Sequence, residues 1–181
     1  MGRKARGREI SGWVNLDKPR EVGSTPAVAA VRRMFDAKKA GHAGTLDPLA
    51  SGILPVALGE ATKTVQFMQA ARKNYEVRLR WGVATQTDDV EGEIIETSEH
   101  RPSARDIVAA LPHFTGDIMQ IPPAYSAIRK DGLRAYKLAR AGESVELAPR
   151  PVRIDAITLI DSALPDACTL QVVCGKGVYI R

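Results

Sequence analysis

Residues 41–52 read Gly-His-Ala-Gly-Thr-Leu-Asp-Pro-Leu-Ala-Ser-Gly, and this stretch is the most informative in the chain. Its first eight residues contain two glycines and a proline, so they cannot form an ordinary helix interior or a central strand. The stretch therefore predicts an irregular loop around one short carboxylate, that of Asp47. From the residues alone, Asp47 is either a functional carboxylate or a turn residue that caps a helix or bonds to its own backbone.

The segments on both sides of this loop predict strands and helices in irregular order. Expected strands are residues 12–16, 75–81, 93–97, 116–121, 152–160 and 168–173, and expected helices are residues 24–35, 60–70, 103–111 and 133–141. Ser24 and Ser103 are the expected helix caps, and strand 93–97 is the expected partner of strand 75–81. Because there is no regular βαβ alternation, we expect an α+β fold with a mixed, largely antiparallel sheet and packed helices.

The composition is that of a folded protein with a basic surface. The 181 residues are 44% hydrophobic and 26% charged, which fits one globular domain and excludes a disordered tail. Twenty-six basic against 21 acidic side chains give a net charge of +5 and a pI near 9.4. This balance suits a polyanionic partner without requiring one.

Cysteine and histidine usage gives expectations about compartment and metal. Cys168 and Cys174, the two cysteines, fall on one face of one expected strand and too far apart to bridge, so we expect buried free thiols and a cytoplasmic protein. The basic start lacks an apolar signal region, and no run is long enough to span a membrane. We therefore expect no membrane partner. Three scattered histidines provide no zinc-type ligand set, so we also expect no metal.

Five segments, in the same order, resemble motifs of the bacterial tRNA pseudouridine-55 synthases, the TruB family. They are the Lys-Pro motif at residues 16–19, the catalytic motif at 41–52, the segment at 59–63, the tyrosine motif at 73–75 and the last core motif at 176–181. Five ordered matches are far more specific than any one of them. The resemblance implies the pseudouridine synthase fold and covers nearly the whole chain.

The resemblance also implies an activity, which is the isomerisation of uridine to pseudouridine at position 55 in the T-loop of tRNA. No cofactor takes part: the uracil is detached from C1′ of its ribose, turned and rejoined through C5. Asp47 aligns with the nucleophile, which would attack either the sugar or the uracil ring. Arg181 aligns with an arginine beside that carboxylate, and we expect the two side chains to form a salt bridge.

Other site residues follow from the same resemblance. Tyr75 aligns with an aromatic that stacks on the target base and can handle the C5 proton, and Tyr179 aligns with a residue lining the uridine pocket. His42 aligns with a residue that fills the space left by the flipped base. Lys18, with Thr45 inside the motif, is expected to support the catalytic loop. The alternative for Tyr75 is a half-buried strand tyrosine with no role in the site, and the alternative for His42 is an ordinary surface side chain.

Basic side chains are the expected contacts to RNA phosphates. They form three clusters, at residues 3–8, at residues 32–39 and at residues 129–140. The alternative for each cluster is a solvent-exposed surface that does not contact RNA. The expected partner is the T-loop of tRNA, bound by a monomer.

Family members continue past the last motif, into the rest of the catalytic domain and a small RNA-binding domain of PUA type. We therefore expect residues 1–181 to be a catalytic domain incomplete at its C-terminus and without a PUA-type domain. The alternative function is that of a catalytically inactive RNA-binding or tRNA-chaperone fragment with the same fold. A hydrolase would need a second carboxylate opposite Asp47, and no sequence spacing supplies one.

Overall fold

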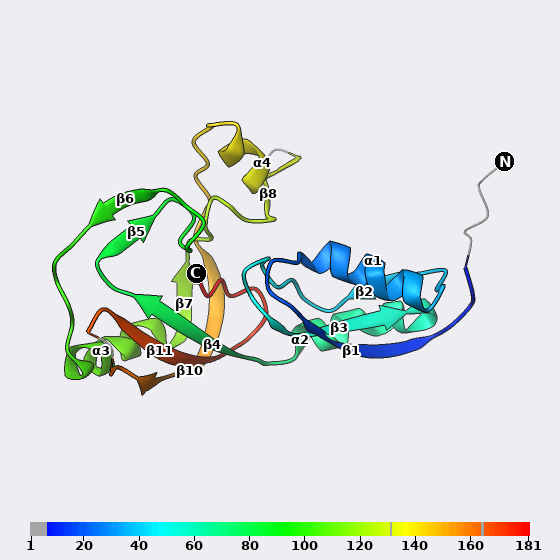
Figure 1. Ribbon diagram of the computed structural model, residues 1–181, viewed down its shortest axis with the longest axis horizontal. Helices are drawn as coiled ribbons and strands as arrows, with labels where there is room; N and C mark the ends of the chain where they lie inside the picture. Colours follow the sequence, from blue (N-terminus) through cyan, green and yellow to red (C-terminus); the bar gives the residue numbers. More distant parts are fainter. Residues whose placement is uncertain (1–6, 131, 164) are drawn as a thin grey trace. The chain divides into compact units, whose positions relative to one another are not determined.

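The computed structural model describes residues 7–130, 132–163 and 165–181 (Figure 1). The chain divides into two compact units, Met1–Ala71 and Arg72–Arg181. Both units combine helices with sheets whose named strands all pair antiparallel, which confirms the expected α+β class. In the described part of the chain, no helix is long and apolar enough to cross a membrane.

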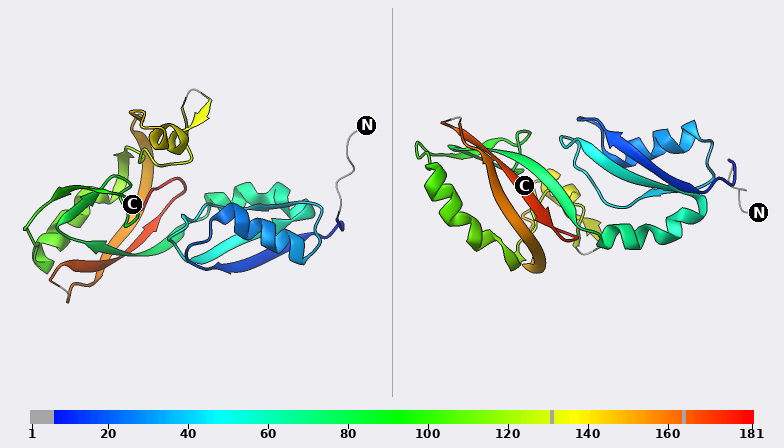
Figure 2. Two further views of the ribbon diagram at one scale, coloured as in Figure 1. Left: turned by 45° about the horizontal axis from the view of Figure 1, so that its top comes forward. Right: turned by 90° about the horizontal axis from the view of Figure 1, so that it is seen from below.

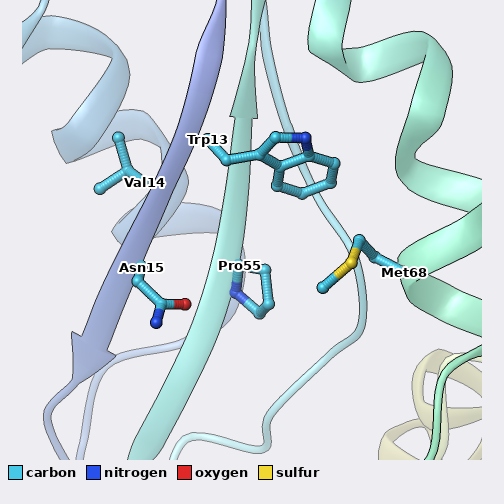
Figure 3. A pocket seen from close by; sticks show the side chains of 5 residues that line it. All are labelled: Trp13, Val14, Asn15, Pro55 and Met68. Atoms are coloured by element: carbon cyan, nitrogen blue, oxygen red, sulfur yellow. The ribbon is translucent and has the colours of Figure 1, made fainter.

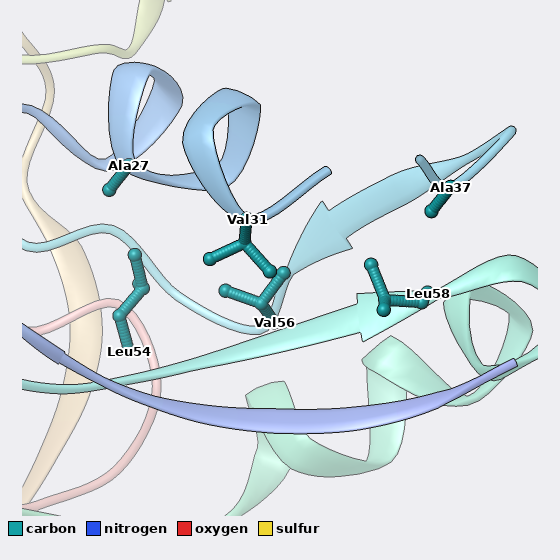
Figure 4. Close-up of a cluster of buried hydrophobic side chains, with 6 residues drawn as sticks. All are labelled: Ala27, Val31, Ala37, Leu54, Val56 and Leu58. Carbon is teal, nitrogen blue, oxygen red and sulfur yellow. The ribbon is translucent and has the colours of Figure 1, made fainter. Parts of the chain in front are cut away.

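The first unit is built on a three-stranded sheet with the order β1-β3-β2. Its strands are β1 (Gly12–Lys18), β3 (Gly52–Leu58) and β2 (Ala40–His42). Helix α1 (Ser24–Met34) covers one face, where Ala27 and Val31 meet Leu54, Val56 and Leu58 (Figure 4). These side chains are buried because β3 is apolar along most of its length and α1 turns its small residues to the sheet.

The other face of this sheet carries a hollow lined by Trp13, Val14, Asn15, Pro55 and Met68 (Figure 3). Met68 comes from α2 (Val65–Ala70), which follows the 3₁₀ helix η1 (Gly59–Thr64). The single helix expected over residues 60–70 is therefore two elements.

Gly59 begins this 3₁₀ segment because no other residue fits there. Its φ is +52°, and a Cβ would lie 2.3 Å from the carbonyl oxygen of Ile10.

The second unit contains a four-stranded sheet with the order β4-β11-β10-β7. Its strands are β4 (Lys73–Arg80), β11 (Ala167–Cys174), β10 (Arg150–Asp161) and β7 (Gly116–Gln120). Helix α3 (Ala104–Ala110) lies along this sheet (Figure 2). Its Ile107 packs on Cys168 and Leu170. The remaining elements are β5 (Val83–Thr85), β6 (Ile94–Thr97), η2 (Leu111–Phe114), β8 (Arg129–Lys130), β9 (Leu133–Arg134) and α4 (Ala135–Arg140).

Several expectations for this unit are confirmed. Ser103 caps α3 through a reciprocal pair of bonds with Asp106, and strands β7, β10 and β11 lie where alternation predicts them. Cys168 and Cys174 are both free and buried on β11.

Three further expectations about elements are wrong. The strand at 93–97 does not pair with β4: it forms β6, pairs with β5 and is exposed at every residue. Strand β4 pairs instead with β11, whose buried side chains match its alternating face. Helix α4 begins at Ala135, two residues later than expected, because the two preceding residues form β9, which pairs with β8. Strand β2 includes Gly41 and His42, the first two residues of the expected irregular loop.

Candidate active site

Asp47 lies in the loop that joins β2 to β3. Residues 18–24 donate hydrogen bonds to the backbone of this loop. Four of the loop's carbonyl oxygens accept hydrogen bonds from that segment: those of Leu46, Pro48, Leu49 and Ala50. The Pro48 carbonyl accepts from the backbone N–H of Glu21 at 2.7 Å, and that of Leu49 accepts from Nε of Arg20 at 3.2 Å. The backbone on both sides of Asp47 is thus restrained, although the segment has no regular secondary structure.

Lys18 provides the most buried of these anchors. Its side chain has no exposed surface, and its ammonium donates to the carbonyls of Ala50 at 2.5 Å and Val22 at 2.7 Å. Burial lowers the pKa of Lys18, and the nearby negative charge of Asp47 opposes this shift. The Lys18 ammonium therefore has two effects: it donates hydrogen bonds to the loop backbone, and it places a positive charge near the Asp47 carboxylate.

Ser24 has a different role from the one expected. The cap residue of α1 is Gly23, and the Ser24 side chain makes no capping bond. Its hydroxyl donates to the Leu46 carbonyl and accepts from the Leu46 backbone N–H, both at 2.9 Å. The expected cap is wrong because this hydroxyl satisfies the loop backbone instead of the helix end.

His42 and Thr45 differ in their environments. His42 ends β2, and its Nδ1 contacts the Gly44 carbonyl oxygen. Since a carbonyl only accepts, this bond requires the hydrogen on Nδ1 and leaves Nε2 as an acceptor in the neutral ring. Thr45 is exposed on the loop surface. The structure thus brings His42, Thr45, Asp47 and Lys18 into one unit.

The predicted tyrosines belong to the second unit. Tyr75 lies on β4 opposite Val172 and packs at the edge of a buried cluster that Val178 and Ile180 also contact. The backbone of Tyr179 is held at both its N–H and its C=O by the side-chain amide of Gln120, each at 2.9 Å. The Arg150 guanidinium lies 5.2 Å from the centre of the Tyr179 ring, within range of a cation–π contact.

Arg181 is also in the second unit, where its side chain bonds to two separate segments of the chain. Its guanidinium donates to the carbonyls of Thr87 at 2.9 Å and Tyr125 at 3.0 Å, and it lies 3.4 Å from a carboxylate oxygen of Asp89. Asp47 and Arg181 are in different units, so their expected salt bridge stays a prediction.

Sequence reasoning missed four residues that position these groups: Ser24, Asp89, Gln120 and Arg150. Asp89 lies in an acidic turn, and nothing in the turn's composition distinguishes it from its neighbour Asp88. Gln120 reads as one more polar residue of an alternating strand.

A family model described as "TruB family pseudouridylate synthase (N terminal domain)" matches residues 32–180. The chain belongs to the TruB family. The tRNA pseudouridine synthase B of Dinoroseobacter shibae is 56% identical over the whole chain, and that of Bradyrhizobium diazoefficiens is 58% identical over 174 residues. These alignments cover 60% and 50% of the two relatives, so the TruB-family chain spans little more than half of their length.

Solved structures agree with the family assignment. A chain from the crystal structure of a Cbf5-Nop10-Gar1 complex matches 96% of the TruB-family chain with a TM-score of 0.70 and 27% identity, and the match covers 42% of that chain. A chain of the archaeal box H/ACA sRNP Nop10-Cbf5 complex matches with a TM-score of 0.65 and 26% identity, over 96% of this chain and 40% of that one. The α+β arrangement is therefore the pseudouridine synthase fold.

The basic clusters of the TruB-family chain are partly engaged within the protein. Arg32 and Arg33 are exposed at the end of α1, whereas Lys38 pairs with Glu9 at 2.9 Å. In the third cluster, Arg140 lies 5.7 Å from the centre of the Tyr136 ring. The first cluster, at residues 3–8, lies mostly outside the described residues.

Proposed function

We propose that this TruB-family chain carries out the isomerisation of uridine to pseudouridine at position 55 in the T-loop of tRNA. Relatives at 56% and 58% identity are named tRNA pseudouridine synthase B, which supports this substrate and product. The observation that carries the proposal is the placement of Asp47 on an irregular loop with bonded backbone on both sides. A nucleophile must be aimed, and a restrained loop aims it without a regular element.

The reaction is an isomerisation, so no atoms are gained or lost. The bond between C1′ and N1 of the uridine breaks, and a bond between C1′ and C5 forms. The proton leaves C5, and N1 carries a proton in the product. In our proposal, the Asp47 carboxylate provides the nucleophilic oxygen, and the buried Lys18 provides a positive charge near it.

The uridine must leave the RNA stack before Asp47 can reach it. Flipping costs a few kcal/mol and is easiest in an already distorted loop such as the T-loop. We assign His42 to the space that the flipped base leaves, and Tyr75 and Tyr179 to the pocket that receives it. The exposed cations Arg32 and Arg33 are candidates for phosphate contacts.

We also propose that residues 1–181 belong to one pseudouridine synthase catalytic domain and that the protein works as a monomer in the cytoplasm. The two free cysteines support the compartment, because buried thiols suit a reducing environment.

Replacing Asp47 with asparagine tests the nucleophile. The amide keeps the side chain's shape but lacks the nucleophilic oxygen, so we expect no pseudouridine in an unmodified tRNA transcript, with RNA affinity within a few-fold of wild type. Asp36→Asn is the matched control, because it makes the same charge change at an exposed residue of the same unit. Turnover by the Asp47 variant would overturn the mechanism, and wild-type binding without product would favour a non-catalytic RNA-binding fragment.

A further inference from the structure

We infer that Ser24 is a positioning residue for Asp47, a role that rests on the proposed function of that carboxylate. The Ser24 hydroxyl is the only side-chain group among the described residues that bonds both backbone groups of Leu46, the residue directly before Asp47. It donates to the carbonyl and accepts from the N–H, each at 2.9 Å.

This contact restrains the backbone that leads into Asp47. The N–H of Leu46 belongs to the peptide plane before its Cα, and its carbonyl belongs to the plane that continues into Asp47. One hydroxyl therefore holds both planes and limits both backbone dihedral angles of Leu46. Those two angles orient the peptide plane that leads into Asp47, and they therefore restrict where its Cα lies and the range of directions open to its Cα–Cβ bond.

The hydroxyl itself has a rigid support. Ser24 is 4% exposed and lies in the first turn of α1, whose Ala27 and Val31 are buried against the sheet. Leu46 also packs its side chain against that core, so the two Ser24–Leu46 hydrogen bonds, which we call the Ser24 clamp, join two parts of one packed cluster. After Asp47, the Lys18 ammonium and the Glu21 N–H hold the chain again.

Burial separates this role from a catalytic one. With so little exposed surface, the Ser24 hydroxyl cannot contact a bound nucleotide, so its effect on the reaction passes through the Leu46 backbone. A misplacement of about 1 Å near a reacting group can cost about a hundredfold in rate. We therefore expect Ser24→Ala to lower kcat by about 10- to 100-fold with little change in KM or in RNA affinity.

Two control variants separate positioning from general destabilisation. Thr25→Ala removes a hydroxyl from the next, exposed residue of the same helix turn. Val31→Ala weakens the packing of α1 but leaves the Ser24 contacts in place. Each variant is assayed on the tRNA transcript at the same temperature interval below its own Tm, and we expect both controls to keep a kcat near that of wild type.

Amide hydrogen exchange provides a readout without turnover. We expect the Leu46 amide to exchange at least tenfold faster in Ser24→Ala and at the wild-type rate in Thr25→Ala, since only the first variant removes its acceptor. Unchanged exchange at Leu46, or equal losses of kcat in Ser24→Ala and Val31→Ala, would overturn the inference. A wild-type chain that binds RNA but forms no pseudouridine counts against the proposed function alone, and the exchange rates then decide whether the clamp exists.

Discussion

Replacing Lys18 with methionine should destabilise the first unit far more than its single lost charge suggests. The methionine fills nearly the same volume, but the carbonyls of Val22 and Ala50 lose donors at 2.7 Å and 2.5 Å. A buried acceptor left without a partner costs about 1–3 kcal/mol. Relief from burying an ammonium, whose pKa is already lowered, offsets part of this loss.

We therefore expect the free energy of unfolding to fall by about 3 kcal/mol. For a chain of this size, that corresponds to a decrease in Tm of about 6–12 °C. Urea unfolding at pH 7, followed by circular dichroism, measures the difference directly. Lys38→Met is the matched control: its side chain is 45% exposed and pairs with Glu9, so the expected loss is below about 1 kcal/mol.

The comparison between the two methionine variants decides whether the reasoning holds. If Lys18→Met is no less stable than Lys38→Met, the ammonium does not hold the loop, and the bonds to the loop carbonyls contribute little to folding. A large loss in both variants would mean that the surface pair is stronger than exposed pairs usually are.

Three further predictions concern other parts of the chain. The hydroxyl and backbone N–H of Ser103 lower the pKa of Asp106, so the stability from this cap is present above the usual carboxyl pKa and is lost as pH falls through the lowered one. Ser103→Ala should raise that pKa towards its usual value in an NMR titration, and an unchanged titration would contradict the capping box. Gln120→Ala should cost about 1–3 kcal/mol in thermal unfolding, because the Tyr179 backbone loses both partners; an unchanged Tm would show that water replaces them. RNA affinity should fall with salt by about 0.7 log units per log unit of salt for each phosphate contacted, and a flat dependence would argue against phosphate contacts.

Periodicity predicted the elements of the second unit well but not how its strands pair. The alternation along β4, β10 and β11 shows which residues face a core, and Ser103 marks where α3 begins. Alternation does not specify a partner strand, however. The nearest candidate, residues 93–97, pairs elsewhere, because β4 forms its ladder with a strand far along the chain.

The loop around Asp47 could be predicted from its glycines and proline, whereas the groups that hold it could not. Ser24 stands where a helix cap is expected, and a capping serine and a loop-clamping serine look alike in sequence. Gln120 and Asp89 contact residues that are 59 and 92 positions away, so no local pattern identifies them.

The pairing of β4 with β11 has a consequence for folding during synthesis. Lys73 pairs with Cys174, so these two partners are 101 positions apart in the sequence. The sheet of the first unit is complete once residue 58 has been made, because all three of its strands have then been translated. Strand β4 ends at Arg80 and β11 ends at Cys174, so at about 5–20 residues per second the ribosome delivers the partner of β4 about 5–20 s after β4 itself. During that interval the apolar face of β4 has no native partner strand, and the nascent chain depends on other contacts to keep it from aggregating.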